Sequence, residues 1–116
     1  MEYRIYTSNG KELAEIISGN FLIRTPQDLL DIMTRVKSST LIFKKEMLPE
    51  SFFDLKSGLA GEIMQKISNY RLKMAVVGDF SGYAGTSLRD FIRECNRSNN
   101  VVFVDDVNTA IQKLSV

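Results

Sequence analysis

The sequence predicts one α/β domain, residues 1–116, in which an N-terminal β-hairpin is followed by three helix–strand pairs and a last helix. Two observations lead to this fold class. Asn9-Gly10 separates two apolar runs near the start, and short strand-like runs then alternate with helical apolar stripes. Strands that alternate with helices join through right-handed crossovers, so we expect a mixed, largely parallel sheet.

The hairpin strands are expected at residues 3–7 and 13–17. Asn-Gly readily accepts the positive φ angles of a type I′ turn, which is why the turn is placed between them. The pattern of residues 21–23 leaves two alternatives open: an extension of the sheet, or a packed segment that leads into the next helix.

The first helix has the clearest start signal in the chain. Thr25 is placed as its N-cap, Pro26 as its first helical residue and Asp28 as the acid three residues after the cap. An apolar stripe reaches Val36 and predicts the length of the helix. A buried strand is expected at residues 40–44, followed by a long connection over residues 45–56.

The second half of the chain repeats the alternation of helix and strand. The second helix carries an apolar stripe from Leu59 to Ile67, and Ser87 with Asp90 resembles a capping box for the third helix. Asp105-Asp106 should cap the last helix. Strands are expected at residues 72–77 and 101–104.

Composition excludes several classes of protein. The chain is 44% hydrophobic and 25% charged, as is typical of a soluble globular protein, and its net charge of +1 gives no field that would attract nucleic acid or an anionic membrane. The start resembles no signal peptide, and no apolar run could span a bilayer. The single cysteine, Cys95, rules out an internal disulfide, so a cytoplasmic location is expected.

Histidine is absent, which removes histidine bases, Ser-His-Asp triads and histidine metal sites. The glycine-rich loop of residues 78–85 matches neither a Walker A sequence nor a dinucleotide fingerprint. We therefore expect no catalytic residues, no cofactor and no metal, and an enzyme is the less favoured class.

One stretch carries a resemblance to known proteins. The run SFFDLKSGLAGEIMQKISNYRLKMAVVGDFSGYAGTSLRDFIREC, residues 51–95, resembles an uncharacterised bacterial family classed as a domain of unknown function, and the likeness extends over nearly the whole chain. The element order is also similar to the STAS domain of sulfate transporters and anti-sigma-factor antagonists. In those antagonists, the serine of an Asp-Ser-Ser-Gly-Leu loop is phosphorylated by a partner kinase.

Ser57-Gly58-Leu59 matches the end of that loop, whereas Lys56 replaces the other serine and Asp54 lies one residue further upstream. The resemblance implies a contact or phosphorylation loop made by Asp54, Lys56, Ser57 and Gly58. The alternative is a purely structural role: Ser57 only caps the second helix, Gly58 packs closely, and the aromatic pair Phe52-Phe53 fills the core below.

Loops at the carboxyl ends of parallel strands often bind ligands, because helix N-termini point there. Four residues of the glycine-rich loop and the helix start after it form a candidate ligand rim: Asp79, Ser81, Tyr83 and Thr86. Our favoured hypothesis is a non-enzymatic regulatory module that binds a protein partner. The alternative is a binder of a small anionic ligand, or an enzyme, that uses Ser57 and this rim.

Self-association is a further expectation. The outer strand of the hairpin should leave backbone groups unpaired, and its apolar residues Tyr3, Ile5 and Tyr6 favour pairing with a second copy. A homodimer is thus expected alongside the unknown protein partner.

Overall fold

The chain folds around a five-stranded sheet whose strands lie in the order of the sequence. The computed structural model describes residues 1–20, 22–83 and 85–116. The strands are β1 (Tyr3–Ser8), β2 (Lys11–Ile16), β3 (Thr40–Lys44), β4 (Lys73–Val77) and β5 (Val101–Val104). Strands β1 and β2 pair antiparallel, and all later neighbours pair parallel. The predicted mixed α/β fold class is confirmed.

The helices also follow the predicted order. They are α1 (Pro26–Val36), α2 (Glu50–Phe53), α3 (Leu59–Asn69), α4 (Thr86–Ser98) and α5 (Val107–Leu114). The connection that the sequence left without structure contains α2 between two 3₁₀ turns, η1 (Lys45–Met47) and η2 (Leu55–Ser57).

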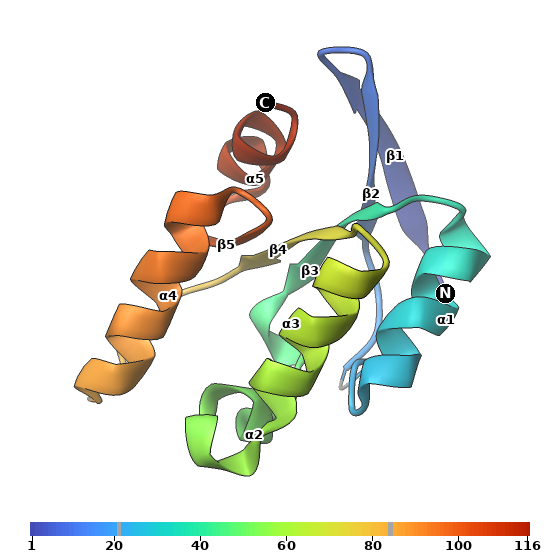
Figure 1. Cartoon of the computed structure of the whole chain (residues 1–116). Helices are drawn as coiled ribbons and strands as arrows, with labels where there is room; N and C mark the ends of the chain where they lie inside the picture. Colours follow the sequence, from blue (N-terminus) through green and yellow to red (C-terminus); the bar gives the residue numbers. More distant parts are fainter. Residues whose placement is uncertain (21, 84) are drawn as a thin grey trace.

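The sheet separates two layers of helices (Figure 1). Helices α1, α3 and α4 pack with the larger core on one face, and α5 packs with a smaller core on the other. The three crossovers all step in the same direction across the sheet, and right-handed crossovers of that kind place their helices on one face. The second face is therefore left for α5.

The hairpin turn has the geometry that its sequence predicts. Asn9 and Gly10 both have positive φ, 52° and 73°. Of the two alternatives for residues 21–23, the described residues fit the packed segment: Ile23 is fully buried, lies in no strand and donates its N–H to the Met47 carbonyl at 3.1 Å. Phe21 lies outside the described residues.

Two of the three caps predicted for the first, third and last helices are confirmed. Thr25 and Asp28 form the capping box of α1, and the Asp106 carboxylate accepts the Thr109 N–H at 2.7 Å. The capping box predicted for Ser87 and Asp90 is wrong, because α4 begins two residues earlier than that capping box would place it. Its N-cap is Gly85, which has no side chain that could accept a hydrogen bond from a backbone N–H of the first turn. Asp90 instead forms an ion pair with Arg93 at 3.4 Å.

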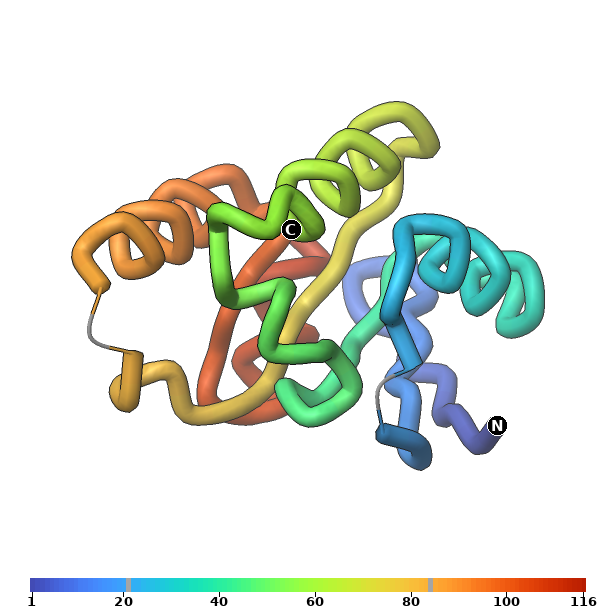
Figure 2. The backbone as a smooth tube through the Cα atoms, turned by 90° about the horizontal axis from the view of Figure 1, so that it is seen from below, coloured from blue at the N-terminus to red at the C-terminus, as the bar shows by residue number. Residues whose placement is uncertain are grey.

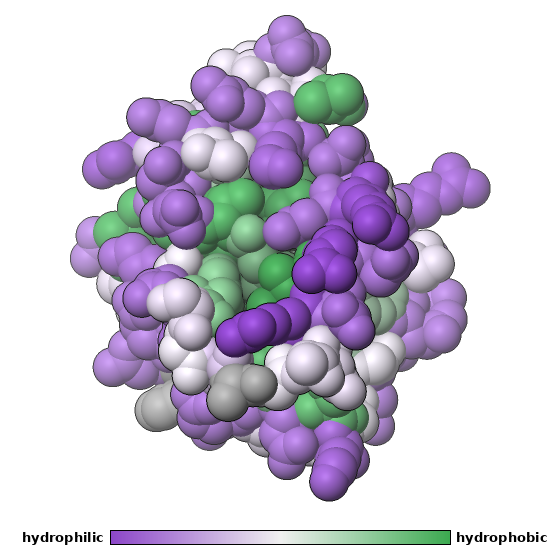
Figure 3. Space-filling model, turned by 90° about the vertical axis from the view of Figure 1, so that its left-hand side faces the viewer, coloured by the Kyte–Doolittle hydropathy of each residue, from purple (hydrophilic) through white to green (hydrophobic). Residues whose placement is uncertain are grey.

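The edge strand β5 lies between α4 and α5 (Figure 1). Seen from this side, apolar surface gathers in a shallow central hollow that hydrophilic side chains surround (Figure 3). No helix in the described part of the chain combines the length and the apolar character needed to cross a bilayer.

Candidate functional site

The carboxyl ends of the parallel strands form one end of the molecule, which Figure 2 views directly. The segment from η1 to η2 follows β3 there, and the glycine-rich loop that leads to α4 follows β4. This is the end at which the sequence placed both candidate sites.

An aromatic cluster supports this end from below. Phe52 and Phe53 are 0% and 6% exposed and meet edge to face, with their ring centroids 5.1 Å apart. Phe53 also stacks on Tyr83 at 5.2 Å, and Phe52 lies 6.2 Å from Phe103 of β5. The prediction that the aromatic pair fills the core is confirmed, and the pair ties the η1–η2 segment to the loop after β4.

Ser57 is exposed, and both functions of its hydroxyl are engaged. The hydroxyl donates to the Ser51 carbonyl and accepts the Leu59 N–H at 3.2 Å. The formal N-cap of α3 is Gly58, so the predicted N-cap position is wrong by one residue. The hydroxyl nevertheless satisfies the first amide of α3, which is the chemistry that the capping interpretation assigned to it.

Gly58 is required for its backbone conformation. Its φ is 82°, in the left-handed region, and a Cβ built at this position would meet no atom within 4 Å. The interpretation of Gly58 as a residue of close packing is therefore wrong. Glycine at this position lets the chain turn from η2 into α3.

A cleft of about 360 Å³ lies between η2 and the first turn of α4. Phe53 and Leu88 are the buried residues in its wall, and Leu55 is half-buried. Asp54 and Lys56 also line it and are both exposed. We call this feature the α4 cleft.

The uncapped start of α4 contributes to the same cleft through Gly85 and Ser87. The first amides of a helix point outward without partners in the helix, and the positive end of the helix dipole lies there. Within the described residues, the α4 cleft thus combines an apolar wall, the exposed side chains of Asp54 and Lys56, and a helix start that has no side-chain cap.

The residues of the candidate ligand rim have different surroundings. The Asp79 carboxylate accepts the N–H and hydroxyl of Ser81 at 2.9 and 2.6 Å, and these bonds lower the pKa of Asp79. Thr86 is the first residue of α4. Tyr83 turns inward onto Phe53, and burial raises the pKa of its hydroxyl.

Lys45 connects these loops, and the sequence analysis did not single it out. Its ammonium donates to the Asp79 carbonyl at 3.0 Å and lies 4.6 Å from the centre of the Tyr83 ring. A Cβ on Gly78 would come within 2.7 Å of the Lys45 Cβ. The glycine that directly follows β4 was the available signal, because a glycine at a strand end often marks a close approach of another chain segment.

The family model described as "Domain of unknown function (DUF4180)" matches residues 8–114. The chain belongs to this family. No curated protein and no solved structure matches the chain. The predicted membership of an uncharacterised family is thereby confirmed.

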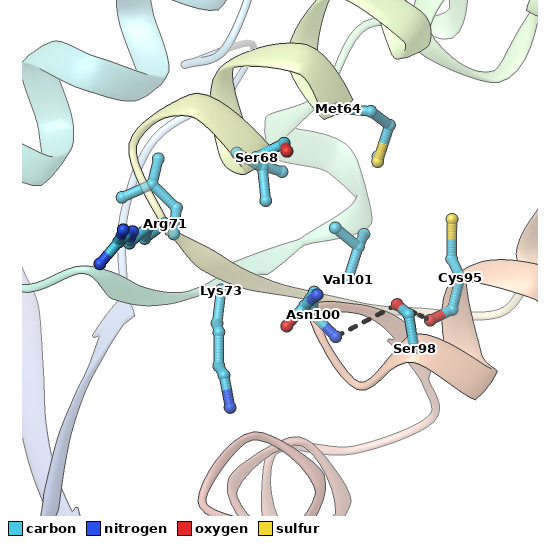
Figure 4. A pocket seen from close by; sticks show the side chains of 10 residues that line it. Met64, Ser68, Arg71, Lys73, Cys95, Ser98, Asn100 and Val101 are labelled. Atoms are coloured by element: carbon cyan, nitrogen blue, oxygen red, sulfur yellow. Dashed lines mark hydrogen bonds between the residues drawn. The ribbon is translucent and has the colours of Figure 1, made fainter.

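The opposite end of this DUF4180 domain, where the strands begin, also has a cavity. This cavity of about 460 Å³ lies between α3 and α4, and Met64 and Cys95 extend into it from the two helices (Figure 4). Burial, with a smaller contribution from the charge of Glu94, raises the pKa of the Cys95 thiol to about 11. The half-buried thiol is thus protonated at neutral pH.

The described residues bring no three carboxylates or thiols together in a way that could hold a metal ion.

Proposed function

We propose that this chain is a non-enzymatic, cytoplasmic regulatory module that binds a protein partner through the α4 cleft, on a fold arranged like that of the STAS domain. The single observation that supports it is the composition of the cleft. Its wall is apolar at Phe53, Leu55 and Leu88, and an exposed lysine and an uncapped helix start lie at its margin.

These features favour a partner segment of a particular chemistry. An apolar side chain would gain by leaving water for the cleft wall, at roughly 25 cal/mol for each Å² buried. A carboxylate or phosphate next to it would meet Lys56 and the first amides of α4. The partner we expect therefore presents an apolar residue beside an acidic group.

Ser57 fits this role as a neighbour of the contact surface. A phosphate on Ser57 would add about −1.5 to −2 charges next to Lys56 and would change the local field without entering the core. Asp54, three residues upstream, is a second negative group that a phosphate would repel.

The test compares a charge reversal at Lys56, which lines the α4 cleft, with one at Lys66 in the last turn of α3. We would immobilise the wild-type protein and the variants Lys56→Glu and Lys66→Glu and expose each to lysate of the native cells. Captured proteins are identified, and the affinity of each is then measured with purified components. The proposal expects a saturable partner that Lys56→Glu loses and Lys66→Glu retains. Equal binding by all three proteins, or the absence of a saturable partner, would contradict it.

A second candidate function is the binding of a small anionic ligand at Ser57 and the loop of residues 78–85. The uncapped N-terminus of α4 next to Lys56 favours it, whereas the inward orientation of Tyr83 removes part of the expected rim. A thermal-shift panel of sugar phosphates, nucleotides and carboxylates distinguishes the two. A ligand at one hundred times its dissociation constant adds about 2.7 kcal/mol of stability.

A further inference from the structure

A cavity of about 480 Å³ lies where β2, β3 and β4 begin, at the opposite end of the molecule from the α4 cleft. Four cations line it: Lys11 of β2, Lys37 after α1, Arg71 after α3 and Lys73 of β4. Glu12 is the acid that lines it. The cavity therefore carries a formal charge of +3, from four positive groups and one negative group, in a chain whose net charge is +1.

None of the side-chain ion pairs among the described residues involves these four cations. Within the described residues, the ion pairs are Arg93 with Asp90 and Arg97 with Glu94, both on α4. The ammonium of Lys11 already donates to the backbone oxygen of Val116 at 2.7 Å, so Lys37, Arg71 and Lys73 are the cations left to bind a ligand in the cavity. In Figure 4, Arg71 and Lys73 extend away from the sulfur atoms of Met64 and Cys95, so their charged ends do not fill the cavity between α3 and α4.

The backbone gives a second, independent observation. Lys37 and Arg71 both have left-handed conformations, with φ of 55° and 54°. The other described non-glycine residues with positive φ are Asn9 and Asn99, and asparagine tolerates this region far better than a long side chain does. Two cations thus occupy left-handed positions at helix ends, where glycine or asparagine is usual, and both line the same cavity. Backbone strain that the surrounding structure maintains is often associated with a functional site.

We infer that this cavity binds a small phosphate-bearing molecule, whose oxyanion lies between Lys37, Arg71 and Lys73. A guanidinium can hold two phosphate oxygens at once, and ammonium groups add charge-assisted bonds from the sides. Four cations facing one hollow also raise the local concentration of anions. The size of the cavity lies within the range of pockets that hold small ligands.

The positions of Lys37 and Arg71 have one competing explanation. Both follow the carboxyl ends of helices, where a cation interacts favourably with the negative end of the helix dipole. That explanation predicts that a neutral residue lowers the stability of the fold. The binding inference predicts that asparagine, which relaxes the strain, keeps or raises stability and weakens binding.

The experiment is calorimetric titration of the full chain with pyrophosphate at low salt, with inorganic phosphate and adenosine diphosphate as further arms. The variants are Lys37→Asn, Arg71→Asn and a matched control, Arg24→Gln. Arg24 precedes α1 and so lies at the other end of the sheet, and its replacement changes the net charge by the same amount. Thermal unfolding of each variant is recorded in parallel.

The inference expects saturable binding of pyrophosphate with one site per chain. Each asparagine variant should weaken it about tenfold, equivalent to the loss of one charge-assisted contact, with a thermal midpoint equal to or above that of wild type. Arg24→Gln should bind as wild type does. Tighter binding of adenosine diphosphate than of pyrophosphate would identify the ligand as a nucleotide.

Two results would overturn the inference. One is the absence of saturable binding for every phosphate compound. The other is equal weakening by Arg24→Gln and by the two asparagine variants, which would show only a general effect of net charge. Neither result bears on the α4 cleft, because Lys56 and Leu88 are unchanged in all these proteins.

Discussion

The side-chain amide of Asn96 in α4 pairs with both backbone groups of Phe103 in the edge strand β5. The Phe103 N–H donates to Asn96 Oδ1 at 2.7 Å, and Asn96 Nδ2 donates to the Phe103 carbonyl at 3.4 Å. In a parallel strand, the N–H and C=O groups of one residue both point toward the same neighbouring strand. Phe103 directs both groups to the open edge of the sheet, so the Asn96 amide takes the place of a sixth strand. An edge covered in this way is protected against pairing with another chain.

Replacing Asn96 with alanine should therefore have two effects. The half-buried Phe103 groups lose their partners, at a cost of about 1–3 kcal/mol in the free energy of unfolding, and the β5 edge opens. Urea denaturation measures the first effect, and light scattering measures the second. The control Arg97→Ala, at an exposed site, should change stability by less than about 0.5 kcal/mol. Equal stability of the two variants would contradict the role given to Asn96.

The edge of β1, in contrast, has no such cover within the described residues, and we expect self-association there. Tyr3 and Ile5 are each 43% exposed on one face of the hairpin, beside the unpaired side of β1. The prediction is a dimer whose population rises with concentration and falls in Ile5→Lys. Tyr70→Lys is the matched control, because Tyr70 is 51% exposed elsewhere. A wild-type chain that stays monomeric at high concentration in light scattering would disprove it.

Alanine substitutions at two glycines should change the stability of the fold in opposite directions. Gly58→Ala should destabilise the chain by about 1–2 kcal/mol, because alanine would have to adopt a φ of 82° without gaining any contact. Gly61→Ala lies inside α3, where an added Cβ also meets nothing, and should stabilise by about 0.5–1 kcal/mol. Chemical denaturation of both variants gives the comparison, and changes of the same sign would refute it.

Ser57 should tolerate negative charge without unfolding. Ser57→Asp keeps an acceptor for the Leu59 N–H but loses the bond to the Ser51 carbonyl, so we expect a loss of about 1 kcal/mol together with altered partner binding. Ser57→Ala loses both bonds and should be the less stable of the two. Phosphosite mass spectrometry on protein from its native cells tests the modification itself, and an unmodified Ser57 under growth and stress would leave the serine with a structural role alone.

The thiol of Cys95 should react slowly at neutral pH and faster as the pH approaches about 11. Because burial raises the folded pKa above the usual 9.0, the protonated thiol contributes stability that is fully present below pH 9. That contribution is lost as the pH rises through the folded pKa. Rates of thiol labelling between pH 7 and pH 10, with urea-unfolded protein as the reference, measure the shift. Equal labelling rates for the folded and unfolded chains would exclude a raised pKa of Cys95 in the folded protein.

The order of elements could be predicted from the sequence because each signal was local. The Asn9-Gly10 turn and the caps at Thr25 and Asp106 depend on residues within one or two turns, and the structure contains all three. The α4 start was predicted wrongly for the same reason. Ser87 and Asp90 have the correct spacing for a capping box, but α4 begins at Thr86, so Ser87 lies inside the helix.

The candidate site could be predicted only in part. The sequence placed residues 54–58 and the loop after β4 at the same end of the sheet, because the carboxyl ends of parallel strands coincide. It did not predict that Lys45 would lie over Tyr83, since that contact joins residues far apart in the chain. The cluster at Lys11, Lys37, Arg71 and Lys73 was missed for the same reason: three separate strand starts contribute to it.

The arrangement of α5 has a consequence during protein synthesis. Ile42, Ala75 and Val102 face the smaller core, and α5, which covers them, is made last of the elements in the structure. A nascent chain emerging from the ribosome can therefore complete one layer while the other side of its sheet is still bare and apolar. We expect this half-covered intermediate to be the species that chaperones recognise, and its lifetime to depend on how quickly residues 107–114 leave the exit tunnel.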